Sequence, residues 1–152
     1  NTIISRCQVI RFRSFSGKQI NNLLGDHLDL SKFKINRKLK YEDLINLSNG
    51  SPGQLLKNIE NWNDLSDEII SKLDYPIKDS LEILELSKLI SDQLDIDQQI
   101  CLVNFIQIIW WRQTKNFDLI KDLEKLKFNL RRNIQPRLSW EINFLKIAMQ
   151  NI

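Results

Sequence analysis

The chain has 152 residues, of which 42% are hydrophobic and 27% are charged. These proportions are typical of a globular protein and exclude a disordered or fibrous one. No apolar run reaches the roughly 20 residues that a membrane-spanning helix needs, so we expect no membrane association. Cys7 and Cys101 lie far apart, and His27 is the only histidine, so neighbouring residues cannot form a zinc cluster. This pattern predicts a reducing, cytoplasmic environment in which both thiols are buried.

The net charge of +3 is unevenly distributed along the chain. Residues 1–41 contain nine Lys or Arg and two Asp, a net charge of +7, whereas the remaining residues carry a net charge of −4. Because a basic segment attracts phosphate, residues 1–41 are a candidate for contact with a nucleotide or with DNA. The competing interpretation is an ordinary solvated surface.

The first part of the chain predicts one strand followed by a helix. Residues 8–12 are rich in β-forming residues and predict a strand, which needs partners that this chain does not supply. Since the chain also starts without Met, we expect it to begin inside a domain. Ser16 followed three residues later by Gln19 is a capping box, which predicts a helix that runs to about Leu28.

The pattern beyond this point is helical throughout. The first group of helices is expected at residues 41–49, 51–62 and 65–73. Tyr75 precedes Pro76, which disfavours helical geometry, so the boundary between two units is expected there. The second group is expected at residues 81–90, 98–115, 117–132 and 136–151. In the first of these, the predicted buried stripe consists of Leu81, Leu84, Leu86, Leu89 and Ile90.

No self-contained active site is visible in the sequence. The phosphate-binding glycine loop, the GxSxG turn and the HExxH motif are all missing, and no pair of acids stands out. We therefore expect no catalysis by this chain alone, and no cofactor or metal bound to it. Three other segments carry information about function.

The first segment is residues 2–7, which contain Ser5, Arg6 and Cys7 directly before the predicted strand. It resembles the Ser-Arg-Cys motif that closes the AAA+ nucleotide-binding domain of bacterial DNA polymerase III clamp-loader subunits. The resemblance implies that Arg6 is an arginine finger, which reaches the ATP bound by a neighbouring subunit. A planar, permanently charged guanidinium suits phosphate oxygens because it donates two parallel hydrogen bonds. The alternative is a surface ion pair.

The second segment is the turn formed by Gly50, Ser51, Pro52 and Gly53. Gly50 can end one helix, Ser51 can cap the next, and Pro52 fits its first turn. The turn resembles the one that opens the last helix of the AAA+ lid. ATP-hydrolysing relatives have an arginine at its fourth position, where this chain has Gly53, so the resemblance implies a non-hydrolysing subunit of the delta prime type. An ordinary junction between two helices would explain the same residues.

The third segment surrounds the start of the last predicted helix. Pro136 can begin the helix, Arg137 and Glu141 lie four residues apart on one face, and Leu138 and Ile142 are expected to face inward. The segment resembles the signature of the collar domain in delta prime subunits. The short collar and the tail with its tryptophan most resemble cyanobacterial forms. The resemblance implies a role in subunit assembly for these positions: Asn133, Pro136, Arg137, Leu138 and Glu141.

Together the three segments predict an all-α chain with a remnant strand at its start. Residues 1–14 would end the AAA+ domain, residues 15–74 would form a three-helix lid, and residues 77–152 would form a helical collar. The implied partners are subunits of the gamma/tau and delta types, with the sliding clamp and primer–template DNA contacted through the complex.

Two alternatives stay open at this point. One is a fragment of an ATP-hydrolysing gamma/tau-type subunit, against which Gly53 argues. The other is a free-standing helical adaptor or DNA-binding module, in which Trp110 and Trp111 could stack on bases. Packing in the core is the preferred interpretation of these tryptophans, because they end an apolar helix.

Overall fold

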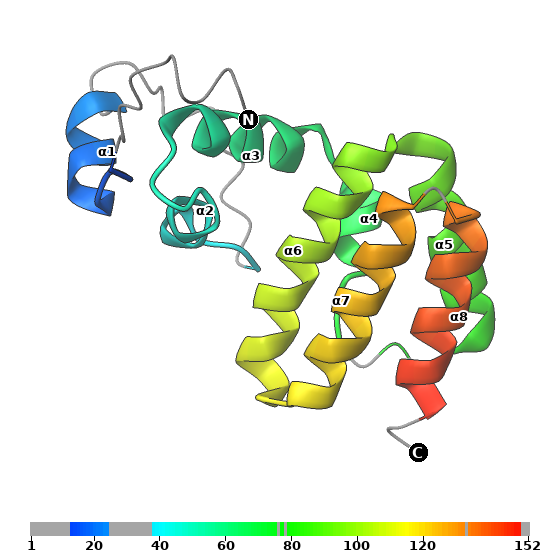
Figure 1. Cartoon of the computed structure of the whole chain (residues 1–152). Coiled ribbons are helices and arrows are strands. Elements are labelled where there is room, and N and C mark those ends of the chain that lie inside the picture. Colours follow the sequence, from blue (N-terminus) through cyan, green and yellow to red (C-terminus); the bar gives the residue numbers. More distant parts are fainter. Residues whose placement is uncertain (1–12, 25–37, 76, 78, 133, 150–152) are drawn as a thin grey trace, which may run out of the picture.

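The computed structural model describes residues 13–24, 38–75, 77, 79–132 and 134–149, and all regular structure in these ranges is α-helical (Figure 1). The predicted all-α class is therefore confirmed, whereas the strand predicted at residues 8–12 lies outside the described residues. The helices are α1 (Gly17–Leu24), α2 (Tyr41–Leu47), α3 (Pro52–Asp64), α4 (Asp67–Ser71), α5 (Ser80–Gln93), α6 (Ile96–Thr114), α7 (Phe117–Arg131) and α8 (Pro136–Met149).

Side chains before the helices fix where several of them begin. The backbone N–H of Gln19 donates to Ser16 Oγ over 3.4 Å, and the N–H of Ser16 donates to Gln19 Oε1 over 2.9 Å. This reciprocal arrangement is the predicted capping box of α1. Asp95 and Gln98 form the same arrangement at the start of α6. Such caps satisfy backbone donors that have no partner inside the helix.

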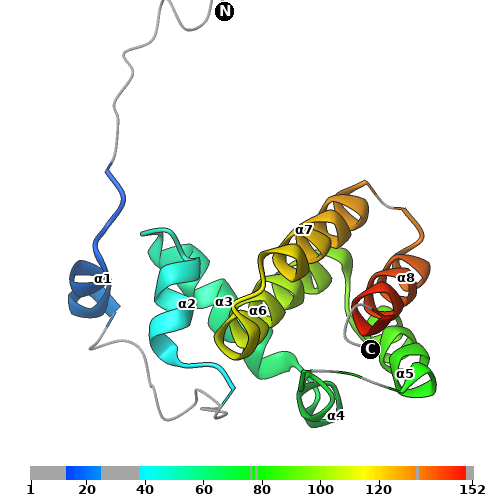
Figure 2. The ribbon, with the colours of Figure 1, turned by 90° about the horizontal axis from the view of Figure 1, so that it is seen from below.

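The helices α5 to α8 form an up-down-up-down bundle (Figure 1). In the end-on view of Figure 2, α7 lies between α6 and α8, and α8 packs against α5. The long helix α6 also contacts α3, so it is covered on two sides. It is buried over most of its circumference, as the almost continuous apolar sequence predicted.

The apolar face of α5 differs from the predicted stripe. Leu86 and Ile90 are buried as expected, but Leu81 is 69% exposed and Leu84 is also exposed. Ile83 is fully buried instead. The buried positions follow the 3.6-residue helical period that faces α8, and Leu81 falls on the other side of the helix.

Side chains from the two predicted units pack together in one core. The rings of Trp62 on α3 and Phe105 on α6 meet edge to face, with centroids 5.2 Å apart. The indole N–H of Trp110 on α6 donates to the carbonyl oxygen of Leu73 over 2.9 Å. Both tryptophans are almost completely buried, which confirms core packing for Trp110. The division of the chain into lid and collar stays a prediction.

Candidate subunit-assembly surface

The segment singled out before the last helix lies at the start of α8. Pro136 is the first residue of the helix. Arg137 Nε donates to Glu141 Oε1 over 2.8 Å, so the two residues lie on one face as predicted and also form an ion pair. Asn133 lies outside the described residues. The segment therefore starts the helix and orients its first turn.

One face of α8 carries apolar side chains that point away from the bundle. Leu138 is 44% exposed, Ile142 is 59% exposed and Met149 is 73% exposed, while Leu145 between them is half-buried. The expectation that Leu138 and Ile142 face inward is wrong. These four residues follow each other at intervals of four, three and four, the spacing of the contact seam in a coiled coil. We call them the outer stripe of α8.

The opposite face of α8 is the buried one. Trp140 and Phe144 are almost fully buried, with ring centroids 5.1 Å apart. The indole N–H of Trp140 donates to Gln99 Oε1 over 2.9 Å, which satisfies its polar edge. Because α8 is apolar on two opposite faces, periodicity alone cannot choose between them, and the face with two large aromatic rings buries more surface.

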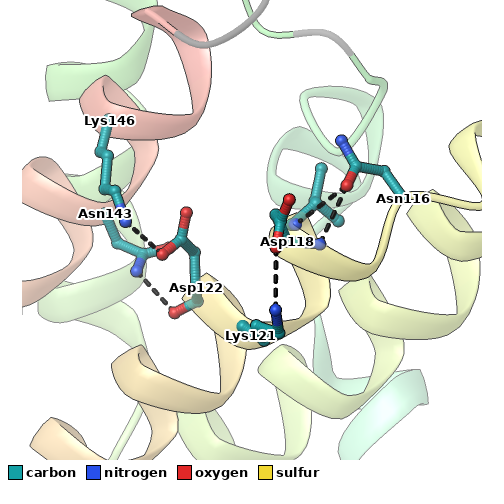
Figure 3. A network of polar contacts seen from close by, with 7 residues as sticks. Asn116, Asp118, Lys121, Asp122, Asn143 and Lys146 are labelled. Carbon is teal, nitrogen blue, oxygen red and sulfur yellow. Dashed lines mark hydrogen bonds and ion pairs between the residues drawn. The ribbon is translucent and has the colours of Figure 1, made fainter.

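Polar contacts between α7 and α8 fix the rotation of α8 (Figure 3). Asn143 Nδ2 donates to the carbonyl oxygen of Asp122 over 2.7 Å, and Lys146 forms an ion pair with the Asp122 carboxylate. Asp122 and Asn143 are both 7% exposed. The sequence did not point to these residues, because pairs of this kind become visible only when two helices are side by side. The contacts hold the outer stripe toward solvent.

Grooves with apolar residues in their lining lie on both sides of α7. The α7–α8 groove encloses about 120 Å³, and its lining includes Lys125, Asn129, Ile134, Leu138, Ile142 and Lys146. The α6–α7 groove encloses about 300 Å³ and is lined by Gln107, Ile108, Trp111, Phe117, Ile120 and Glu124. Apolar side chains make up most of the lining of the α6–α7 groove, whereas the α7–α8 groove combines the apolar Ile134, Leu138 and Ile142 with polar and charged side chains.

The carboxylate of Glu124 on the edge of the α6–α7 groove already has hydrogen-bond partners within the protein. Burial raises its pKa, but hydrogen bonds from Lys127 and Gln107, at 2.5 and 2.9 Å, outweigh burial and hold the pKa below its usual value. Glu124 is therefore ionised at neutral pH and paired within its own helix. Among the described residues that line this groove, the one charged side chain is therefore already paired.

The second segment, the predicted lid turn, lies between α2 and α3. Gly50 has φ +80°, a left-handed conformation that favours glycine, and its carbonyl oxygen accepts a hydrogen bond from the N–H of Phe15 over 3.0 Å. Ser51 Oγ accepts from the N–H of Gln54 over 3.3 Å and caps α3, with Pro52 at the first position as predicted. A Cβ added to Gly53 would meet no atom within 4 Å.

The structure does not bring the lid turn and the start of α8 together. The turn lies beyond α3, and α6 and α7 separate α3 from α8 (Figure 2). Ser5, Arg6 and Cys7 lie outside the described residues. Within the described ranges, no group of three His, Cys, Asp or Glu side chains is placed to hold a metal ion, and no helix is long and apolar enough to cross a membrane.

The comparisons with known proteins yielded one match. Residues 27–147 match the family model described as "Cyanobacterial DNA polymerase III delta prime, C-terminal domain". No curated protein and no solved structure matches the chain. The matched range includes the lid turn and all of the bundle helices α5 to α7, together with most of α8. The chain therefore belongs to the family of cyanobacterial DNA polymerase III delta prime C-terminal domains.

Proposed function

We propose that the bundle α5–α8 joins this clamp-loader subunit to its neighbours, and that the outer stripe of α8 is part of the contact. Membership in the delta prime family makes the chain part of a DNA polymerase III clamp-loader subunit. The observation that carries the assembly role is the apolar stripe that α8 leaves exposed beside the motif of Pro136 and Arg137. Exposure of apolar side chains to water is unfavourable, and a partner that covers them lowers the free energy. Their coiled-coil spacing suits such a partner.

Replacing Ile142 tests the assembly role. Ile142→Glu puts a charge in the centre of the stripe, so we expect binding to the other clamp-loader subunits to weaken by at least about tenfold in a reconstitution followed by size-exclusion chromatography. Helical content should be unchanged, because the side chain is 59% exposed.

Leu81→Glu is the matched control. Leu81 is also an exposed apolar residue of the bundle, but it belongs to α5 rather than to the stripe. We expect this variant to assemble like the parent. Normal assembly of Ile142→Glu, or equal loss in both variants, would remove the stripe from the interface.

The proposed subunit does not hydrolyse ATP itself and offers Arg6 to the ATP of a neighbour. The Ser-Arg-Cys motif supports the finger, and Gly53 supports the non-hydrolysing role. A Cβ at position 53 would meet no atom within 4 Å, so contacts at that atom do not require glycine there. In this role the subunit acts in the cytoplasm, with gamma/tau and delta-type neighbours, during loading of the sliding clamp on primer–template DNA.

Arg6→Ala in the full-length subunit tests the finger. We expect the DNA-stimulated ATPase rate of the reconstituted complex to fall strongly, toward the roughly 10³-fold loss that removal of such a finger causes elsewhere, while assembly stays intact. Arg6→Lys keeps the charge but not the planar fork, and it should restore only part of the rate. An unchanged rate with Arg6→Ala would exclude the finger.

A further inference from the structure

We propose that a polar groove between α3 and α6 binds an extended protein segment through its main chain. Amide side chains from both helices line the groove: Gln54, Asn58 and Asn61 on α3 and Asn104 on α6. We call it the amide groove. The two helices contact each other (Figure 2), and the groove shares no residue with the outer stripe of α8. The proposal therefore does not depend on the assembly role of that stripe.

Asn58 is the residue that indicates a ligand. It is 4% exposed, and its Nδ2 has no hydrogen-bond partner among the described residues. Gln54 Nε2 donates to Asn58 Oδ1 over 2.9 Å, and the Cys101 thiol donates to the same oxygen over 3.8 Å. Two donors on the oxygen fix the orientation of the amide, so its NH2 group is left unused. A buried donor without an acceptor is unfavourable, and a carbonyl oxygen that meets Nδ2 removes that cost.

The thiol of Cys101 supports this orientation of Asn58. Burial raises the pKa of the thiol, and this effect outweighs the hydrogen bond with Asn61 and the charge of Lys57, which both lower it. The thiol is therefore protonated at neutral pH. A protonated thiol donates to Asn58 Oδ1 and adds no negative charge to the amide groove.

The charges in the lining indicate a neutral ligand. Lys57 Nζ lies 3.7 Å from Asp97 Oδ2, and these two are the charged side chains among the described lining residues. The lining therefore has no net charge that would select an anion or a cation. Asparagine and glutamine side chains combine an acceptor with donors, and the C=O and N–H groups of a peptide main chain complement both.

A nucleic acid fits the amide groove less well. Amide side chains do pair with the edges of bases, but bound single strands also need rings to stack on and cations for their phosphates. Among the described residues that line the groove, none is aromatic and none is arginine, and Lys57 is paired with Asp97. These features favour a protein segment.

The dimensions of the groove suit about three residues of extended chain. Its walls run from Gln54 to Asn61 and from Asp97 to Asn104, so each advances by seven residues, or about 10.5 Å of helix. Three residues of a strand span about 10 Å. The groove encloses about 140 Å³, which is room for more than a single water molecule.

Two capped tripeptides, triglycine and trisarcosine, test the proposal with the isotope-labelled 152-residue chain. Both have the same carbonyl groups, but in trisarcosine methyl groups replace the hydrogens of the three residues' amides. We expect NMR titration with triglycine to shift the side-chain NH2 signals of Asn58. Triglycine should bind at least about fivefold more tightly than trisarcosine, because only triglycine donates hydrogen bonds to the amide oxygens of the groove.

Asn58→Leu tests the site itself. Leucine has a similar size but no N–H group, so we expect triglycine no longer to shift the side-chain signals of Asn61 and Asn104. Asn63→Leu is the matched control, because Asn63 is also on α3 but does not line the groove. It should bind triglycine like the parent. If Asn58→Leu does not fold, the comparison of the two tripeptides on the parent chain still decides.

Several results would overturn the proposal. Equal binding of triglycine and trisarcosine would exclude recognition of the main chain, and triglycine shifts that leave Asn58 unaffected would exclude the groove. No shift with either tripeptide would mean that water alone satisfies Asn58. Tighter binding of an eight-residue oligothymidylate at these signals would assign the groove to nucleic acid. Ile142→Glu should bind triglycine normally, so this proposal and the assembly role fail separately.

Discussion

Ser87 on α5 is completely buried, and its Oγ has no hydrogen-bond partner among the described residues. A hydroxyl that leaves water without gaining a hydrogen bond is unfavourable. We therefore expect Ser87→Ala to raise the free energy of unfolding by about 0.5–1.5 kcal/mol, because alanine removes the hydroxyl and favours the helix. Urea unfolding followed by circular dichroism measures the change.

Ser91 provides the control for that substitution. It lies one turn later on α5, is half-buried, and its Oγ donates to the carbonyl oxygen of Ser87 over 2.8 Å. Ser91→Ala loses this hydrogen bond, so we expect little or no gain in stability. A lower free energy of unfolding for Ser87→Ala would mean that the hydroxyl has a partner after all.

At the scale of elements, the turn between α2 and α3 places two glycines in different situations. A Cβ on Gly50 would lie 2.6 Å from the carbonyl oxygen of Phe15 and from the Cβ of Ser14, and φ is already positive there. Gly53 is in the first turn of α3 and has open space around it. One glycine is required by the conformation and the other is not.

The two alanine variants should therefore change stability in opposite directions. Gly50→Ala is expected to lower the free energy of unfolding by about 2–4 kcal/mol, through strain at positive φ and contact with the backbone. Gly53→Ala is expected to raise it by about 0.4–1 kcal/mol, because alanine restricts the unfolded chain. Thermal unfolding of the two variants tests this, and a tolerated Gly50→Ala would contradict the described turn.

At the scale of the whole molecule, the helices α2 to α4 and the bundle are joined by several different contacts. The side chain of Asp43 on α2 forms an ion pair with Arg112 on α6. The edge-to-face contact of Trp62 with Phe105 and the hydrogen bond from Trp110 to Leu73 connect the same parts of the molecule. Contacts of this kind favour unfolding as one cooperative unit.

Truncating Trp62 tests that cooperativity. Trp62→Ala should lower the free energy of unfolding by about 3–5 kcal/mol, because the side chain is fully buried. If the core is shared, amide exchange should accelerate in α6 and α7 as well as in α3. Trp111→Ala, which removes a half-buried ring packed on Phe117, is the control and should cost less. Faster exchange confined to α3 would favour independent units.

The sequence predicted the local features of the candidate site but not its orientation. Several local features depend on neighbours within a few residues, and the structure confirms them. They are the starts of α1, α3 and α8, the turn at Gly50, and the position of Arg137 and Glu141 on one face. The interior of the bundle was harder to predict. The buried pair of Asp122 and Asn143 joins residues 21 apart, so no local pattern could indicate it.

The sequence by itself determined the family, through its motifs, and the all-helical class. The class could be predicted because caps, glycine turns and helical periodicity act over short distances along the chain. Only the tertiary structure decided which face of α8 is buried. Both faces are apolar, and the choice depends on the contacts of Trp140 with Gln99 on α6 and of Lys146 with Asp122 on α7. Those partners come close only after α6, α7 and α8 have packed, and their packing leaves Leu138 and Ile142 exposed to a partner.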